Sequence, residues 1–210
     1  ALTGAGAELV YVDSLSDKML PAIDGLYIGG GFPELHLESL VANKKLMKDT
    51  ANAIEKGLVV YAECAGLMYL SRGIRKNGML FEMAGVIPSE VELSKRPQGH
   101  GYVESKVIRE TPFFQVGATL HGHEFHYSRL TGTNDMQYAL EILKGQGING
   151  ISDGIIYKNM FASYTHFHAS GTKQWAGLFV SSILKQKRRL GWDDKDIFTR
   201  RHYGGNMSGV

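Results

Sequence analysis

The sequence has few of the features that mark secreted or membrane proteins. Its 210 residues include one cysteine, Cys64, which excludes an internal disulfide framework. No apolar run approaches the roughly 20 residues of a membrane span, and the longest, from Leu58 to Leu70, contains Glu63. Residues Ala1–Gly6 do not read as a secretory signal. The lone thiol and eight methionines instead favour a reducing cytoplasm.

Composition and charge exclude further classes of protein. Hydrophobic residues make up 43% and charged residues 21%, which excludes a disordered, collagenous or coiled-coil chain. The net charge of +2 is unevenly distributed along the chain. Residues 185–210 carry seven basic against three acidic side chains, or +4, and residues 1–184 carry 16 against 18, or −2. The body is therefore not predicted to bind nucleic acid, and the basic end reads as a solvated helix end with a tail.

In the first part of the chain, the hydrophobic pattern predicts alternating strands and helices. Short apolar runs predict strands at Glu8–Asp13, Asp24–Ile28 and Leu58–Ala62. A three-to-four spacing of apolar residues predicts a helix over Pro33–Lys56, and a second helix is expected to start at Gly66. This order is typical of an α/β protein with a mostly parallel central sheet and helices on both faces.

The second part of the chain is richer in β-structure. The pattern predicts several antiparallel strands in residues 100–145, two more at Ile155–Ile156 and Phe161–Tyr164, and a helix at Thr172–Lys187. We therefore expect one α/β domain over residues 1–190 with an antiparallel β insertion, followed by a basic tail over residues 191–210.

The strongest local signal for chemistry surrounds Cys64. An apolar strand leads through Glu63 into Cys64, and the small residues Ala65 and Gly66 then begin a helix. A tight strand-to-helix turn of this kind exposes a nucleophile, and the start of a helix favours a thiolate. The alternative is that Cys64 is a small buried hydrophobe, as many free cysteines are.

A thiol nucleophile needs donors for the oxyanion that develops during the reaction. Gly29-Gly30-Gly31, followed by Phe32 and Pro33, comes at the end of a predicted strand, and glycines let backbone N–H groups turn outward. The alternatives are an ordinary connecting loop or a phosphate-binding loop. The second is disfavoured, because no G-x-x-x-x-G-K-[ST] motif occurs in the chain.

A base is also required, and eight histidines are available. His166 follows a predicted core strand, where a base is expected at the carboxyl end of an open α/β sheet. On a strand, His121 and His123 would share one face, while Glu124 and His126 would share the other. Because these side chains do not converge, no metal site is predicted, and structural pairing or substrate contact is favoured.

Four motifs in this order carry a resemblance to a known family: Gly30–His36, Tyr61–Leu70, Gly122–Ser128 and Ala162–His166. Together they closely resemble the glutaminase domain of cobyrinic acid a,c-diamide synthases, which are class I-like, triad-type glutamine amidotransferases. The resemblance extends over about residues 8–185. It implies a flavodoxin-like α/β fold and the hydrolysis of glutamine to glutamate and ammonia.

The resemblance also implies roles for individual residues. Cys64 is expected to attack the glutamine amide, with His166 as the base and later as the acid. Backbone N–H groups of Ala65 and of Gly31 or Phe32 are expected to form the oxyanion hole.

One position departs from the broader amidotransferase pattern. The acidic residue expected two positions after the base is replaced by His168, so a Cys–His dyad is predicted. Glu63 is a candidate for orienting the imidazole; the alternative is a carboxylate at the edge of the core that pairs with backbone donors. His168, His123 and Glu124 are further candidates for orienting or substrate contacts. The Gly122–Ser128 motif is a candidate for shaping the glutamine pocket or the face toward a synthetase domain.

The family further implies partners for this domain. No cofactor is expected here, whereas ATP and Mg²⁺ are expected in a synthetase domain that amidates acetate side chains of a tetrapyrrole. No phosphate-binding loop occurs in this chain. The synthetase is therefore expected in a longer protein from which this piece is cut, or in a separate chain, and a homodimer of the full enzyme is a candidate assembly.

Two alternatives to this function stay open. One is a cobyric acid synthase-like or other amidotransferase or amidase. The other is a non-catalytic domain that docks a synthetase or binds a tetrapyrrole through His123 or His126.

Overall fold

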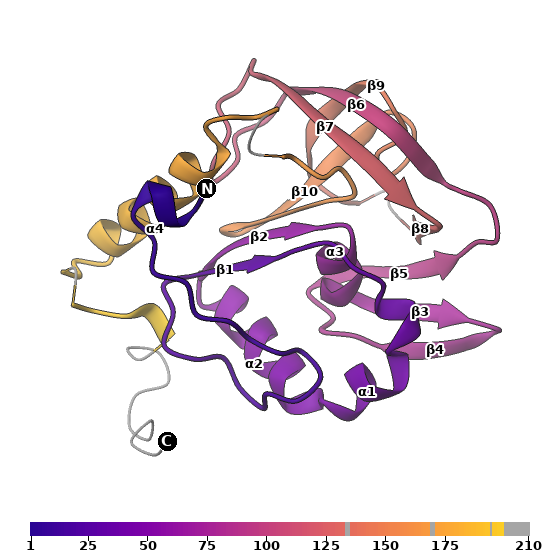
Figure 1. Cartoon of the computed structure of the whole chain (residues 1–210), viewed down its shortest axis with the longest axis horizontal. Helices are drawn as coiled ribbons and strands as arrows, with labels where there is room; N and C mark the ends of the chain where they lie inside the picture. Colours follow the sequence, from indigo (N-terminus) through magenta and orange to yellow (C-terminus); the bar gives the residue numbers. More distant parts are fainter. Residues whose placement is uncertain (133–134, 169–170, 194, 200–210) are drawn as a thin grey trace.

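The structure is a computed structural model that describes residues 1–132, 135–168, 171–193 and 195–199 (Figure 1). Its main sheet has seven strands in the spatial order β1 (Gly25–Ile28), β2 (Val59–Glu63), β11 (Met160–Ser163), β10 (Ser152–Tyr157), β9 (Tyr138–Lys144), β6 (Gly99–Val107) and β7 (Thr119–His126). A smaller sheet has the order β4 (Met79–Glu82), β3 (Ser71–Lys76), β5 (Ile87–Leu93) and β8 (Ser128–Thr131). The helices are η1 (Thr3–Ala5), η2 (Pro33–Leu35), α1 (Leu37–Ala42), α2 (Lys44–Glu55), α3 (Ala65–Leu70) and α4 (Trp175–Arg189).

The predicted α/β class is confirmed, and the sheet combines both kinds of pairing. β2 lies between β1 and β11 and pairs with each in parallel, with Tyr61 level with both Tyr27 and Phe161. From β11 outward the neighbours are antiparallel, so the predicted insertion continues the main sheet through β10, β9, β6 and β7. The parallel part is thus confined to three strands.

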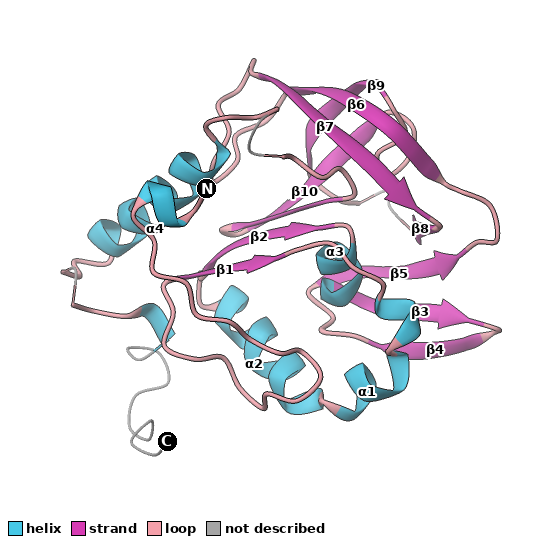
Figure 2. Ribbon diagram, in the orientation of Figure 1, coloured by secondary structure: helices cyan, strands magenta, loops and turns pink. Residues whose placement is uncertain are grey.

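Helices cover both faces of the parallel strands, as Figure 2 shows for α2 and α4. All five residues of β2 are buried. Val60 and Ala62 belong to the core that includes α2 and α3, while Val59 and Tyr61 belong to the core formed with α4. A strand buried on both faces reads as an unbroken apolar run, which is why this strand could be identified from its sequence.

The predicted strand at Glu8–Asp13 is wrong. The segment contains no strand, and Leu9, Val10 and Tyr11 are 44%, 51% and 87% exposed. A strand requires a partner for its backbone groups, and no described strand pairs with this segment.

The predicted helix over Pro33–Lys56 is divided into η2, α1 and α2. The break between α1 and α2 is at Asn43, whose φ and ψ are −94° and 46°. Its buried side-chain amide donates to Ser14 O at 2.9 Å and to Asp17 O at 2.7 Å. Asn43 therefore leaves the helical conformation and holds the loop that precedes β1.

Strands β3 and β4 are further differences between the structure and the sequence-based prediction, because the sequence pattern predicts neither of them.

The start of the predicted basic tail packs against the domain. Phe198 and Thr199 are 1% and 2% exposed, and the Thr199 N–H donates to Ile23 O at 3.2 Å. Within α4, Lys187 forms an ion pair of 3.1 Å with Asp24. Residues 200–210 lie outside the described part of the chain. Among the helices that the structure describes, none has the length and hydropathy needed to span a bilayer.

The close approach of α3 to β1 depends on Gly66. A Cβ atom at Gly66 would lie 2.4 Å from Ile28 O, which is backbone and cannot move aside cheaply. We expect Gly66→Ala to lower the free energy of unfolding by about 1–3 kcal/mol, as overpacking does. Urea-induced unfolding would measure the change.

Gly177 provides the matched control, because it lies in α4 and a Cβ atom at this position would have nothing within 4 Å. Gly177→Ala should raise stability by up to about 1 kcal/mol, since alanine favours a helix. Equal effects of the two substitutions would contradict the close contact at Gly66.

Candidate active site

Cys64 occupies a strained turn between β2 and α3. Its φ of 47° is positive, which costs a non-glycine residue about 1–3 kcal/mol. The turn is held on both sides: the Cys64 N–H donates to Ser163 O at 2.8 Å, and Cys64 O accepts from the Met68 N–H at 3.0 Å. The side chain is 5% exposed. A cysteine in a strained strand-to-helix turn, held in place by the elements on both sides, has the geometry expected of a nucleophile.

His166 lies just beyond β11, where its main chain pairs with β7. The His123 N–H donates to His166 O at 3.0 Å, and the His166 N–H donates to His123 O at 2.8 Å. The neighbouring Gly122 is required here, because its Cβ would lie 2.5 Å from His166 O. The Gly122–Ser128 motif therefore has a structural function: it fixes the backbone of the predicted base.

Three groups surround the His166 ring. The ring stacks on His123 with centroids 4.9 Å apart and an angle of 13°. Its Nδ1 atom lies 3.7 Å from Glu63 Oε2. A hydrogen bond with Cys64, followed by the interaction with Glu63, raises the pKa of His166 to about 9. Burial and the charge of His166 lower the pKa of His123. At neutral pH, His166 therefore holds the proton and His123 is neutral.

Glu63 is held by three donors in addition to facing His166. Its Oε1 atom accepts from Tyr61 OH at 3.0 Å and from the Phe167 N–H at 2.8 Å, and Oε2 accepts from Tyr27 OH at 3.1 Å. Burial, and then the Glu63 charge, raise the pKa of both tyrosines, so they remain donors. The two interpretations of Glu63 thus combine: the carboxylate pairs with a backbone donor and also lies beside the imidazole.

Asp153, which the sequence pattern does not predict as a site residue, holds the chain just before His166. This fully buried carboxylate accepts from the backbone N–H groups of Gly154, Tyr164 and Thr165 and from the Thr165 hydroxyl, at 2.7–3.0 Å. Burial raises the pKa of Asp153, and these hydrogen bonds oppose the shift. The available signal was an acidic residue close to the predicted strand at Ile155–Ile156.

The glycine loop after β1 lies against both His166 and the start of α3. A Cβ atom at Gly30 would be 2.4 Å from His166 Cε1, and one at Gly31 would be 3.7 Å from the Ala65 Cβ. Phe32 is 60% exposed. Gly31 and Ala65, two of the residues predicted to stabilise an oxyanion, are therefore neighbours.

Other candidate residues lie elsewhere. Glu124 is buried on the opposite face of β7 from His123, and it accepts from the Gln146 and Gly147 N–H groups at 2.7 and 2.9 Å. His168 is exposed. His126 is 4% exposed and stacks on Tyr164. In the part of the chain that the structure describes, no group of three or more His, Cys, Asp or Glu side chains could hold a metal ion.

Comparison with known proteins identifies the family. The profile of the CobB/CobQ-like glutamine amidotransferase domain matches residues 1–174. The chain belongs to this family. Its resemblance to the glutaminase domain of cobyrinic acid a,c-diamide synthases is thereby confirmed.

Curated relatives agree with this assignment, and solved structures share the fold. The chain is 40% identical over 177 residues to cobyrinate a,c-diamide synthase of Magnetococcus marinus and 41% identical over 181 residues to that of Archaeoglobus fulgidus. These matches cover 84% and 86% of this chain but 38% and 40% of the relatives, so the chain spans about two-fifths of their length. The PurLQS structure from Thermotoga maritima shares the fold, with a TM-score of 0.60, 21% identity, and 82% and 83% of the two chains covered. A further glutamine amidotransferase structure has a TM-score of 0.53 at 15% identity, over 76% and 79% of the two chains.

The environment of His166 in this amidotransferase domain predicts a measurable effect of Glu63. Because the Glu63 carboxylate contributes to the raised pKa of His166, Glu63→Gln should lower that pKa from its value of about 9. A titration of the imidazole nitrogens by NMR would measure it. Glu55→Gln, which removes an exposed carboxylate paired with Lys158, is the control and should leave the titration unchanged. An unaltered pKa in Glu63→Gln would contradict the electrostatic role.

The same shift predicts how stability depends on pH. Because the folded state raises the pKa of His166 above its ordinary 6.5, the folded protein binds this proton more tightly than the unfolded chain does. The resulting stability is complete below about pH 6.5 and is lost as the pH rises through about 9. The difference in unfolding free energy between the wild type and His166→Gln should therefore be larger at pH 6 than at pH 10, as measured by urea unfolding. A difference that does not change with pH would argue against the shift.

Proposed function

We propose that this domain hydrolyses glutamine to glutamate and ammonia through Cys64 and His166. One observation carries the proposal: a cysteine in a strained strand-to-helix turn is hydrogen-bonded to a histidine whose pKa is raised to about 9. A sulfur nucleophile next to an imidazolium supplies both the attacking atom and the proton that the leaving nitrogen requires.

The reaction proceeds in two steps. The Cys64 sulfur bonds to the amide carbon of glutamine, the C–N bond breaks, and His166 donates its proton to the departing ammonia. His166 then takes a proton from water, and the oxygen of that water attacks the thioester carbon. The C–S bond breaks, and His166 returns this proton to the departing sulfur, which releases glutamate and regenerates the Cys64–His166 pair.

Backbone groups stabilise the oxyanion of each step. The Ala65 N–H and the N–H of Gly31 or Phe32 are the proposed donors, which the contact between Gly31 and Ala65 supports. The loss of one such donor costs about 3 kcal/mol of the activation barrier in comparable sites. The strain at Cys64 supports this assignment, because the same turn orients the thiol and the N–H group that follows it.

Glu63 is the proposed third member of the site. It lies at the end of β2, next to the nucleophile in the sequence, whereas the broader pattern has an acidic residue two positions after the base. Its distance of 3.7 Å from His166 Nδ1 leaves Nε2 as the nitrogen for proton transfer to and from Cys64. The exposed His168 has no part in this proposal.

The ammonia is proposed to serve the ATP- and Mg²⁺-dependent amidation of acetate side chains on a tetrapyrrole. The support is the name of the relatives, cobyrinate a,c-diamide synthase, and the fact that the chain matches only two-fifths of their length. The proposed partner is a synthetase part or subunit that activates the carboxylates, and the proposed location is the cytoplasm. A tetrapyrrole ligand at His126 has no support, because this histidine is buried.

Replacement of the nucleophile tests the proposal. With the ATP-dependent partner present, Cys64→Ala should reduce glutamate release by at least about 1,000-fold and abolish labelling by a glutamine-mimicking diazoketone. Enzymatic assay of glutamate and mass spectrometry of the labelled peptide would measure the two effects.

His36→Gln serves as the control, because His36 is exposed and has no proposed role. It should retain both activities. Wild-type turnover in Cys64→Ala would contradict the assignment of the nucleophile.

A further inference from the structure

The ring of His123 covers one face of the His166 imidazole. The two ring centroids are 4.9 Å apart and the planes meet at 13°, a near-parallel stack within the range of distances that aromatic pairs prefer. His123 has no part in the proton transfers proposed above. Its side chain is nevertheless the neighbour that lies flat against the base of the reaction.

Backbone pairing places the two rings on each other. His123 and His166 exchange both N–H···O bonds, at 3.0 and 2.8 Å, so they are directly opposed in an antiparallel pair and their side chains share a face. All eight residues of β7 also pair with β6, with His123 opposite Tyr102. The position of the His123 ring is therefore fixed by strand pairing on both sides of its backbone.

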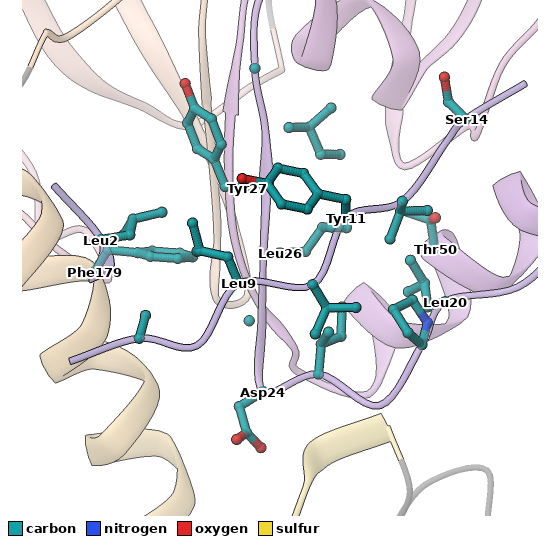
Figure 3. A pocket seen from close by; sticks show the side chains of 18 of the residues that line it. Leu2, Leu9, Tyr11, Ser14, Leu20, Asp24, Leu26, Tyr27, Thr50 and Phe179 are labelled. Carbon is teal, nitrogen blue, oxygen red and sulfur yellow. The ribbon is translucent and has the colours of Figure 1, made fainter. Parts of the chain in front are cut away.

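The glycine loop limits the His166 ring in a different way. A Cβ atom at Gly30 would lie 2.4 Å from His166 Cε1, 3.2 Å from Nδ1 and 3.5 Å from Nε2. These distances place Gly30 beyond the Cε1 edge of the ring and close to its plane. The loop also borders a cavity of about 1270 Å³ beside β1, which Tyr27 lines as well (Figure 3). The loop thus meets an edge of the ring, whereas the strand residue His123 meets a face.

An imidazole that moves protons must be fixed in two respects. The torsion about its Cβ–Cγ bond is broad, so the rotamer alone does not define the ring plane. A half-turn about the same bond keeps the plane but exchanges nitrogen and carbon positions. Glu63 Oε2, which lies 3.7 Å from Nδ1, distinguishes the two half-turns. The stacked ring of His123 restricts the plane.

The charges of the site favour the same stack. At neutral pH His166 is protonated, whereas burial and the charge of His166 keep His123 neutral. A cation within about 6 Å of the face of a neutral aromatic ring is attracted to that face. The ionisable groups whose charges act on this pair are Glu63, Cys64 and His168. The stack is therefore favoured in the state in which His166 holds its proton.

We propose that His123 is a positioning residue for glutamine hydrolysis: its ring fixes the plane of the His166 imidazole and so keeps Nε2 directed at Cys64. Glu63 determines which nitrogen faces the sulfur, and His123 determines the plane in which it does so. This inference rests on the proposed function, in which His166 exchanges a proton with Cys64. A displacement of about 1 Å in such a geometry can cost about 100-fold in rate.

Three variants test the role of the ring. His123→Ala removes it, and His123→Phe keeps an aromatic face without a titratable nitrogen. His121→Ala is the matched control, because His121 is also exposed, shares the face of β7 with His123 and has no proposed role.

The first measurement is glutamate release with the ATP-dependent partner present. We expect His123→Ala to lower kcat by about 10–100-fold while KM changes by less than about three-fold, because the loss affects the geometry of proton transfer. His123→Phe should restore kcat to within about three-fold of the wild type, because it stacks in the same way. His121→Ala should match the wild type.

The second measurement reads the same geometry without glutamine. The hydrogen bond with Cys64 is the largest cause of the raised pKa of His166, and it depends on the orientation of the ring. NMR titration of the imidazole nitrogens should show that His123→Ala lowers this pKa from about 9 toward the ordinary 6.5, whereas His123→Phe keeps it near 9. Urea unfolding of each variant would separate these effects from a change in stability.

Several results would overturn the proposal. A wild-type kcat and an unaltered His166 pKa in His123→Ala would show that the ring plane is fixed without His123. Equal loss of kcat in His123→Ala and His123→Phe would assign the effect to the His123 nitrogens, and a loss confined to KM would assign it to contact with glutamine. Full turnover in Cys64→Ala would refute the proposed nucleophile but not the titration result, so the two failures are distinguishable.

Discussion

A buried carboxylate at the end of β2 connects the sheet to the Cys64–His166 pair. Glu63 accepts from Tyr27 of β1, from Tyr61 of β2 and from the Phe167 N–H beyond β11, and it faces His166. Three neighbouring strands therefore fix one carboxylate, which, after the hydrogen bond with Cys64, contributes to the raised pKa of His166. The site is a consequence of sheet pairing, because the order β1-β2-β11 brings these donors to the same end of the sheet.

This arrangement reduces the cost of burying a negative charge. Burying a carboxylate is costly unless its oxygens are hydrogen-bonded, and Glu63 accepts three hydrogen bonds and lies beside the His166 ring. Asp153 follows the same principle, with four donors from the chain around β10 and β11. Glu63 orders the His166 ring and Asp153 orders the backbone before it. The strained Cys64 can persist, because the elements on either side of it are held independently.

These long-range contacts also mark the limit of prediction from sequence. The strand predicted at Leu58–Ala62, which overlaps β2, the turn at Cys64 and the position of His166 follow from local patterns, because an all-apolar run and small residues after the cysteine have few other interpretations. Glu63 is 104 residues from Phe167 and 36 from Tyr27, so its donors become apparent only once strand order is known. The segment at 8–13 shows the opposite failure: a strand-like sequence does not form a strand when no neighbouring strand is available to pair with it.

Although β1 is short, it contributes to this network in two ways. Its residue Tyr27 donates to Glu63, and its last residue leads into the glycine loop that lies against His166 and Ala65. Any displacement of β1 therefore changes both the carboxylate beside the base and the loop beside the nucleophile. Of the three parallel strands, β2 and β11 have neighbours on both sides, whereas β1 has one among the residues that the structure describes. The least supported strand is thus coupled to both halves of the site, so stability at the outer edge of the sheet and order around Cys64 depend on each other.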